Sequence, residues 1–371
     1  MDSLFVDLSC SECPRRYPAQ LQGLCVCGGP LLARYEGFAD PPKDGGLWDW
    51  QAWLPPCEPV SLGEVATPLI SLGGDGIQSG APRDRSGAFL KDEGRLPTGT
   101  FKARGAAVGV SMAKQLGAEG VVLPTAGNAG SAWAAYAAKA GIGCAVVAAS
   151  GGAPATLEMA RLTGAEVLEV DGGMDQAAIE ATLLAQERGW HYAATFKEPW
   201  RVEGKKTAFF EIYRELGRIP DVVVFPVGGG VGLIAAYLAA MQLRSAGWGV
   251  GMPRLFAAQA EGCAPVVKAF EEGQLEPARW DEPETAAAGI RIPLPPAGKL
   301  LMSAIRKTAG GAVAVSEQEI LSARESVARR TGIILGLEAS TAAAGYLRLK
   351  RAGTFGDLDT VVIYGTGSGR I

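Results

Sequence analysis

The chain has 371 residues, of which 48% are hydrophobic and 20% are charged. These proportions are ordinary for a globular protein with a large core, and the length suits about two or three domains. The formal net charge is −4, and no run of Lys and Arg indicates a nucleic-acid partner. The longest apolar runs, such as Val222–Val227, are too short to span a bilayer, and the N-terminus lacks a signal-peptide pattern. We therefore expect a cytoplasmic protein with no membrane partner.

One histidine and seven cysteines limit the chemistry that the chain can perform. A single histidine, His191, argues against a histidine-based triad or a multi-histidine metal site, so we expect a structural role for it. Seven cysteines without an export signal favour reduced thiols. The pairs Cys10–Cys13 and Cys25–Cys27 resemble a zinc ribbon, although the second pair is one residue short of the usual spacing. A structural zinc ion and metal-free thiols both remain open for this module.

In chain order, the sequence predicts a cysteine module over residues 1–36, a connector rich in Pro, Gly and Trp to Pro59, and alternating strands and helices from Thr67. The predicted strands are Phe89–Lys91, Gly120–Leu123, Cys144–Ala149, Val167–Val170, His191–Thr195, Val222–Pro226, Arg254–Gln259 and Thr360–Tyr364. The predicted helices are Ala103–Leu116, Ala129–Ala140, Pro154–Thr163, Met174–Arg188, Gly204–Leu216, Leu233–Arg244, Lys299–Thr308, Glu317–Thr331 and Ser340–Arg351. This alternation predicts parallel sheets with helices on both faces, where ligands bind at the carboxyl ends of strands.

Lys102 lies between a loop and a predicted helix start, in the stretch KDEGRLPTGTFKARGA from Lys91 to Ala106. A lysine amine acts as a nucleophile only when it is deprotonated, and the small residues around Lys102 leave room for a flat ring. The arrangement suits covalent attachment of an aldehyde cofactor such as pyridoxal phosphate. The alternative is an ordinary lysine that faces solvent.

Asn128 lies in the loop TAGNAG, between a predicted strand and an Ala-rich helix. Its side chain could cap that helix. Alternatively, its amide hydrogen-bonds a ring substituent of a ligand that lies flat against the small neighbouring residues.

A glycine-rich loop follows the apolar strand at Val222–Pro226 and leads directly into a predicted helix. Consecutive backbone N–H groups at a helix N-terminus bind anions. The loop has no Walker-type Lys or Ser/Thr, and no acidic residue occurs between Asp221 and Glu261, which argues against nucleoside triphosphates and dinucleotides. A small phosphate ester fits better. The loop residues are Gly228, Gly229, Gly230, Val231 and Gly232.

Two further segments carry polar groups at positions suited to a ligand. Thr366 follows the strand Thr360–Tyr364, so its hydroxyl could face a heteroaromatic nitrogen, with a flexible tail as the alternative. Arg201, Lys205 and Lys206 lie within six residues around a predicted helix start. Because a helix N-terminus favours anions, an anionic ligand would offset these cations, with a solvated charged face as the alternative.

Together these segments resemble the threonine synthases, within the fold type II (tryptophan synthase β-like) pyridoxal-phosphate enzymes. The resemblance runs from Cys10 to Arg370 and rests on PTGTFKARGA, TAGNAGSA, PVGGGVGLI, EASTAAAG and TGSG, which occur in the family's order. It implies two parallel-sheet α/β domains with the cofactor in the cleft between them, plus the zinc-ribbon-like module. The large domain would span residues 37–102 and 191–371, and a small inserted domain residues 103–190. Homodimerisation is usual for the family.

The resemblance also implies the cofactor, the reaction and the roles of the residues. Lys102 would hold pyridoxal 5′-phosphate and move protons, Asn128 would bond the ring oxygen, and Thr366 would face the ring nitrogen. Gly228 to Gly232 would hold the cofactor phosphate. The implied lyase reaction converts O-phospho-L-homoserine and water to L-threonine and phosphate by γ-elimination and addition of water at Cβ. The implied substrate-binding residues are Thr98, Arg104, Thr125, Arg201, Lys205 and Lys206.

Four positions depart from the family's pattern and leave the substrate open. In the motif that commonly reads NPTGSFKDRG, Leu96 replaces Asn and Ala103 replaces Asp, while Ser368 and Arg370 stand where some members carry His and Lys. An enzyme acting on O-phosphoserine, serine or threonine would look similar, for example a cysteate- or diaminopropionate-forming enzyme or a threonine dehydratase. A non-catalytic scaffold homologue is the alternative from another class, and the retained motifs argue against it.

Overall fold

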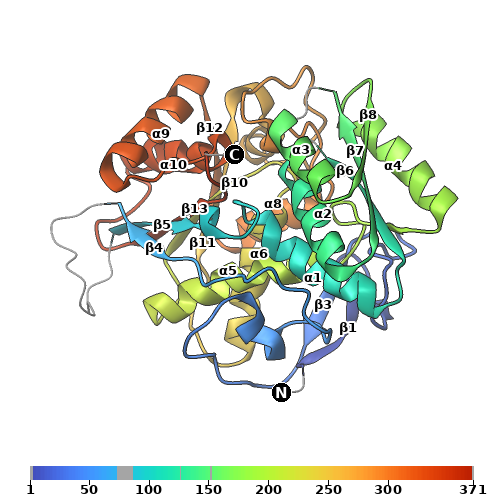
Figure 1. Ribbon diagram of the computed structural model, residues 1–371. Helices are drawn as coiled ribbons and strands as arrows, with labels where there is room; N and C mark the ends of the chain where they lie inside the picture. Colours follow the sequence, from blue (N-terminus) through green and yellow to red (C-terminus); the bar gives the residue numbers. More distant parts are fainter. Residues whose placement is uncertain (1–2, 73–86, 126, 151–152, 370–371) are drawn as a thin grey trace. The chain divides into compact units, whose positions relative to one another are not determined.

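The computed structural model describes residues 3–72, 87–125, 127–150 and 153–369 (Figure 1). Two positions discussed above, Ala126 and Arg370, lie outside the described residues. The chain divides into two compact units: unit 1 comprises Met1–Ala66 and Leu96–Thr207, and unit 2 comprises Thr67–Arg95 and Ala208–Ile371. The domain boundaries given above remain a prediction. Among the described residues, no helix combines the length and the apolar character that a bilayer crossing requires.

The cysteine module of unit 1 is a small antiparallel sheet with the order β2-β1-β3. Its strands are β1 (Phe5–Cys10), β2 (Arg16–Tyr17) and β3 (Leu31–Tyr35), and a 3₁₀ helix η1 (Leu47–Trp53) follows. Leu8 and Leu31 are buried in the same apolar cluster as Val108 and Trp200 of the α/β part. A sheet this small cannot bury a sufficient core alone, so it shares the core of unit 1.

The rest of unit 1 is a parallel four-stranded sheet with the order β8-β7-β6-β9. Val121 and Leu123 face one apolar cluster with the neighbouring helices, and Val122 faces a second cluster with Ala177 and Ala181, so both faces are covered. The strands are β6 (Gly120–Thr125), β7 (Gly143–Ala149), β8 (Glu166–Val170) and β9 (His191–Tyr192). The helices are α1 (Lys102–Gln115), α2 (Asn128–Ala140), α3 (Pro154–Leu162), α4 (Met174–Arg188) and the first part of α5 (Trp200–Leu216).

Unit 2 contains a six-stranded sheet with the order β12-β11-β10-β13-β5-β4, in which only the edge strand β4 runs antiparallel to its neighbour. Ala342 of α10 packs on one face with Val224 and Ile363, while Phe225 points to the other face against α6. The strands are β4 (Leu69–Ser71), β5 (Gly87–Asp92), β10 (Val222–Pro226), β11 (Arg254–Ala260), β12 (Gly311–Val315) and β13 (Thr360–Gly365). The helices are the remainder of α5, α6 (Val231–Ser245), α7 (Pro265–Glu271), α8 (Gly298–Lys307), α9 (Glu317–Thr331) and α10 (Leu337–Arg351), with 3₁₀ turns η2 (Glu93–Arg95), η3 (Glu261–Cys263) and η4 (Ala288–Ile290).

The predicted strands and helices are present, and most boundaries differ by one to three residues. Two differences have a clear physical reason. The helix expected to begin at Gly204 begins at Trp200, because the Glu198 carboxylate accepts hydrogen bonds from its first N–H groups. The strand expected at His191–Thr195 shortens to two residues, because it pairs only with β6 at the sheet edge. The sequence analysis missed β4, β12 and α7.

A buried ion pair joins β5 to the second half of α5 inside unit 2. The Lys91 ammonium donates to Glu211 Oε2 at 2.7 Å and to the Thr67 carbonyl at 2.6 Å, and the Lys91 and Glu211 side chains are 0% and 1% exposed. The Thr67 hydroxyl donates to Glu93 Oε1 at 2.6 Å. Removing one member of such a pair leaves the other as an uncompensated buried charge.

We predict that Glu211→Ala lowers the free energy of unfolding by about 3–5 kcal/mol, because Lys91 would then be buried without its carboxylate. The matched control is Glu325→Ala, whose partner Arg329 lies on the surface and whose loss should cost less than about 1 kcal/mol. Chemical denaturation of both variants checks this. Equal, small losses would contradict the structural role assigned to the buried pair.

Candidate active site

Lys102 is the first residue of α1, and a tight turn positions it. Gly99 adopts a φ of +69°, a left-handed conformation that favours glycine, and the Lys102 N–H donates to the Thr100 hydroxyl at 3.3 Å. The Lys102 amine lies 4.5 Å from the centroid of the Phe101 ring. The Thr98 hydroxyl is buried and has no hydrogen-bond partner among the described residues. Because buried polar groups are rarely left without partners, Thr98 points to a ligand.

Helices α1 and α5 approach closely because each carries a glycine at the contact. A Cβ at Gly105 would lie 2.9 Å from the Arg201 carbonyl oxygen and 3.1 Å from Lys205 Cε, and a Cβ at Gly204 would overlap the Arg104 carbonyl. Arg201 and Lys205 are separated by four residues on α5, so they share one face of the helix. The glycines therefore allow that face to lie against the start of α1.

Arg201 is held by groups of the protein. Its Nε donates to Glu198 Oε1 at 2.7 Å, one terminal nitrogen donates to the Thr195 hydroxyl at 3.1 Å, and the other donates to the Ala193 carbonyl. Its guanidinium also lies 5.0 Å from the Trp133 ring centroid. Two of its five N–H donors remain for a ligand.

Lys205 differs, because it is a buried cation with no carboxylate partner among the described residues. Burial holds the pKa of its amine well below the ordinary value, and repulsion from Lys102 and then Arg201 lowers this pKa further, with Glu198 opposing. Its amine lies 5.0 Å from the Phe101 ring centroid, so Lys102 and Lys205 contact the same ring. Three cations thus face one carboxylate. A bound anion would restore the charge balance and raise the pKa of Lys205.

The two remaining candidate cations are occupied by the protein. Lys206 forms an ion pair with Glu203 and lies 4.0 Å from the Tyr35 ring centroid, and burial lowers the pKa of its amine despite Glu203. Arg104 is fully buried and donates to the Thr207 hydroxyl at 2.8 Å. The solvated face considered for Lys205 and Lys206 is therefore wrong, since both are buried.

Thr125 and Asn128 lie at the junction of β6 and α2. The N-cap of α2 is Gly127, and the Thr125 hydroxyl accepts hydrogen bonds from the N–H groups of Gly127 at 3.0 Å and Gly130 at 3.2 Å. The capping role considered for Asn128 is therefore wrong, because Thr125 serves this helix end. Asn128 is half-buried as the first residue of α2.

In unit 2, the glycine loop connects the carboxyl end of β10 to the start of α6. Gly230 is the N-cap of α6 with a φ of +77°, and a Cβ at Gly228 would lie 2.8 Å from Ile290 Cα. The Gln259 amide donates to the Val227 carbonyl at 3.0 Å and anchors the loop. The first N–H groups of α6 have no acceptor within the helix, so the loop offers donors to an anion.

Thr366 is buried directly after β13. The residues after it are paired: the Gly336 N–H donates to the Gly367 carbonyl at 3.0 Å, and the Gly369 N–H donates to the Ile334 carbonyl at 2.8 Å. The flexible tail considered above is therefore wrong for residues 366–369. The backbone holds the Thr366 hydroxyl at the carboxyl end of a central strand.

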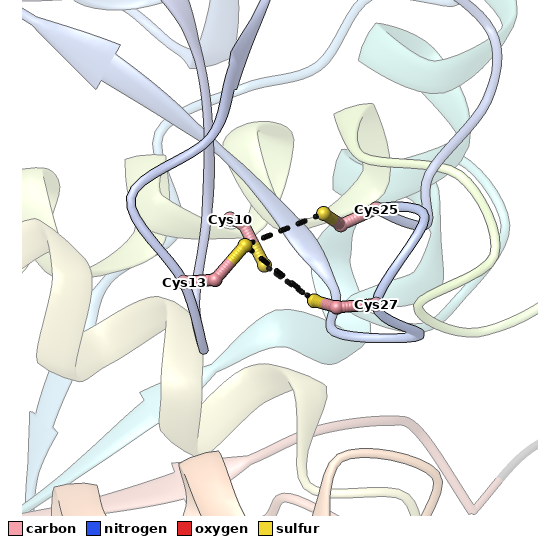
Figure 2. Close-up of side chains that lie close together, drawn as sticks. All are labelled: Cys10, Cys13, Cys25 and Cys27. Atoms are coloured by element: carbon pink, nitrogen blue, oxygen red, sulfur yellow. Dashed lines mark hydrogen bonds between the residues drawn. The ribbon is translucent and has the colours of Figure 1, made fainter.

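The four cysteines of the N-terminal module converge on one point (Figure 2). Sulfur–sulfur distances are 3.5 Å for Cys10 and Cys27, 3.6 Å for Cys13 and Cys25, and 3.6 Å for Cys13 and Cys27. Four thiolates about 2.3 Å from a zinc ion would be separated by about 3.8 Å at tetrahedral geometry, so the set fits zinc. Hydrogen bonds from the Cys27 backbone and the Tyr17 hydroxyl lower the pKa of Cys25 to about 6.

Sequence reasoning did not single out Glu198, Glu203 or Tyr35. Glu198 is fully buried and organises the start of α5, and the Tyr35 hydroxyl donates to Glu203 Oε2 at 2.5 Å. An acidic residue just before a helix start was the available signal for Glu198. No local signal indicated Tyr35, because its partner is 168 residues away in the chain.

Comparison with known proteins defines the class. A family model described as pyridoxal-phosphate dependent enzyme matches residues 60–367, and the chain belongs to this family. It is 37% identical over 327 residues to the threonine synthase of Methanosarcina acetivorans, covering 86% of this chain and 79% of that one. It is 32% identical over 375 residues to the threonine synthase of Methanocaldococcus jannaschii, covering 97% and 91%. The solved T.th. threonine deaminase superposes with a TM-score of 0.64 at 25% identity, covering 77% and 88%. The expected fold class and family resemblance are confirmed.

His191 provides a test of the electrostatics near this site. It is buried, and its Nε2 has no hydrogen-bond partner in the described part of the chain. Burial lowers the pKa of its imidazole, with smaller opposing effects from Glu198, which raises it, and Arg201, which lowers it. The folded protein therefore disfavours the charged imidazole.

We predict a midpoint below about 6.5, the unperturbed histidine value, for the imidazole signals of the protein in an NMR pH titration. A lowered folded-state pKa means that the unfolded chain binds the proton first, so this group's effect on stability is lost as pH falls from about 6.5 through the folded pKa. Because His191 is the only histidine, the assignment is unambiguous. A midpoint at or above about 6.5 would contradict the burial of an unpaired imidazole.

Proposed function

We propose that the chain is a pyridoxal 5′-phosphate-dependent threonine synthase, a carbon–oxygen lyase that converts O-phospho-L-homoserine and water to L-threonine and phosphate. The observation that carries the proposal is the buried cation Lys205, without a carboxylate partner among the described residues, next to Lys102. The identity of 32–37% to threonine synthases over most of the chain supports it. We also propose a structural zinc ion on the four cysteines, a homodimer and a cytoplasmic location.

The residues of each unit fit the cofactor. In unit 1, Lys102 would hold it and Asn128 would bond its ring oxygen. In unit 2, the glycine loop would bind its phosphate and Thr366 would face its ring nitrogen, where a neutral hydroxyl makes the ring a weaker electron sink than a carboxylate does. The unpartnered Thr98 hydroxyl and the exposed donors at the start of α6 support this fit. When bound, pyridoxal phosphate stabilises the carbanions that form beside the amino group.

The side chains of α1 and α5 would perform the remaining steps. The Lys102 amine would take a proton from Cα and then from Cβ of the substrate. The Cγ–O bond would break with its electron pair leaving on the phosphate, and Lys205 would stabilise that developing charge, with Arg201 behind it. Water would then supply a hydroxyl to Cβ and a proton to the remaining carbon framework. The Thr98 hydroxyl would orient the bound substrate.

Burial accounts for two departures from the family motif. Leu96 is 3% exposed and Ala103 is 0% exposed, and both belong to the apolar core of unit 1. An apolar residue at such a position packs well, whereas Asn or Asp would need buried partners. These two changes therefore support no other substrate. Action on O-phosphoserine is the second candidate, because it too carries a phosphate that Lys205 would bind.

The deciding experiment incubates the protein and its cofactor with O-phospho-L-homoserine, then measures phosphate and identifies the amino acid. We expect threonine and phosphate in equal amounts. O-phosphoserine, serine and threonine are tested in parallel. Turnover of one of these in place of O-phospho-L-homoserine, or a folded, cofactor-loaded protein with no turnover at all, would overturn the proposed activity.

Lys102→Ala should lower kcat by roughly 10³-fold or more, since the amine that moves protons is removed. Its circular dichroism spectrum should match that of the unmodified protein. Lys139→Ala, on the exposed face of α2, is the control and should retain full activity. Phosphate release that persists at the original rate in Lys102→Ala would exclude Lys102 as the acid–base group.

Lys205→Met should raise KM for the phosphorylated substrate roughly 10-fold or more, because a charged contact to the phosphate is lost. The visible absorbance of the cofactor and the stability should be nearly unchanged, since the variant also removes repulsion from Lys102 and Arg201. Lys206→Met is the contrast: it leaves Glu203 buried without its cation, so it should lose stability. An unchanged KM in Lys205→Met would remove Lys205 from the phosphate site.

A further inference from the structure

The cysteine module contacts the segment that begins α5. The Gly23 N–H donates to the Lys197 carbonyl at 3.1 Å, and the Trp200 indole N–H donates to the Gln20 carbonyl at 3.1 Å. A Cβ at Gly23 would overlap the backbone of Lys197 and Glu198. The module backbone therefore lies directly against Glu198, the carboxylate that holds Arg201.

A second contact lies one turn further along α5. The Tyr35 hydroxyl donates to Glu203 Oε2 at 2.5 Å, and the Lys206 ammonium lies over the Tyr35 ring at 4.0 Å. The Phe5 ring packs edge-on against Trp200 at 5.7 Å between centroids. These contacts place strands β1 and β3 of the module on either side of the first two turns of α5.

The thiol cluster is connected to the first contact by a short stretch of backbone. Gly23 is two residues from Cys25, and the Gly23 carbonyl accepts from the Leu31 N–H at 2.9 Å. The Cys25 N–H donates to the Gly29 carbonyl at 2.9 Å and closes the loop that carries Cys27. A metal ion on the four thiols would hold both ends of this loop, and Gly23 with them.

We propose that the cysteine module is a positioning element for the phosphate-binding end of α5. A zinc ion on the four thiols holds Gly23 against Glu198, and Glu198 holds Arg201 and the helix turn that carries Lys205. Loss of zinc lets this turn shift and weakens the binding of a phosphate group, while the cofactor stays bound. The inference rests on the proposed function only in assigning a phosphate to Lys205 and Arg201.

The expected effect is large enough to measure. Three hydrogen bonds to Glu198, from the backbone N–H groups of Trp200 and Arg201 and from the Arg201 guanidinium, set the start of α5. A misplacement of about 1 Å at a binding group can cost about 10²-fold. Couplings between two sites typically change affinity by about 5-fold to 150-fold.

The first experiment measures the Kd of inorganic phosphate for the cofactor-loaded protein by titration calorimetry, with and without zinc. Zinc content is measured before and after treatment with a chelator, and zinc is then added back. We expect the zinc-free protein to bind phosphate at least about 5-fold more weakly, and zinc to restore binding. Cys27→Ser should behave like the zinc-free protein, whereas Cys57→Ser, outside the cluster, should not change.

The second experiment removes a contact and leaves the thiols intact. Tyr35→Phe loses the hydrogen bond to Glu203, and Tyr192→Phe, whose hydroxyl donates to the Ala178 carbonyl, is the matched control. We expect Tyr35→Phe to raise the phosphate Kd and the KM of the phosphorylated substrate, while kcat and cofactor absorbance stay the same. A purely structural role for Tyr35 would lower the stability without this split between KM and kcat.

Three outcomes would overturn the inference. The first is a folded, zinc-free protein whose phosphate Kd is unchanged, and the second is a cysteine module that takes up no zinc. The third, which applies even if Cys27→Ser fails to fold, is a Tyr35→Phe variant whose phosphate Kd and KM are both unchanged. Zinc-dependent phosphate binding by a protein that forms no threonine would instead refute the proposed function and leave this inference standing.

Discussion

The balance of buried charge at the start of α5 is the constraint on which the candidate site depends. Glu198 is fully buried, and it is stable there because it accepts two backbone N–H groups and the Arg201 guanidinium. That pairing leaves Lys205 as a further buried cation beside Lys102. A protein that keeps such a charge in its interior has a use for it, since the same position filled by an apolar side chain would cost less. A phosphate group supplies the missing negative charge.

Small residues make this arrangement sterically possible. Gly105 on α1 and Gly204 on α5 remove the side chains that would separate the two helices. Only then do the Lys102 and Lys205 amines reach the same Phe101 ring. The glycine loop in unit 2 follows the same logic, because Gly230 takes a left-handed conformation and leaves the first N–H groups of α6 exposed to a ligand. In both units, backbone geometry comes before side-chain chemistry.

The N-terminal module shows how a small, metal-binding element can serve a larger enzyme. Its strands are too short to bury a core alone, so Leu8 and Leu31 join the apolar cluster of unit 1. The same packing brings Gly23 and Tyr35 onto α5. A module attached in this way transmits its own rigidity to the residues it contacts. Its metal site and the candidate phosphate site are therefore parts of one structure.

The sequence by itself determined the class of fold, the order of most strands and helices, and the identity of the loops that carry chemistry. These features depend on local patterns: strand and helix periodicity, glycines after apolar strands, and Lys102 behind its tight turn. The four cysteines were also recognisable, because metal-ligand spacing is local.

Only the tertiary structure decided the pairing of distant segments. It placed β13 between β10 and β5, and paired β12, which has no strong pattern of its own, with β11. It also separated Lys205 from Lys206, which are adjacent in sequence: Lys206 faces Glu203 and Tyr35, while Lys205 faces Lys102. The physical reason is that burial and charge partners depend on residues far along the chain, and no local pattern encodes them.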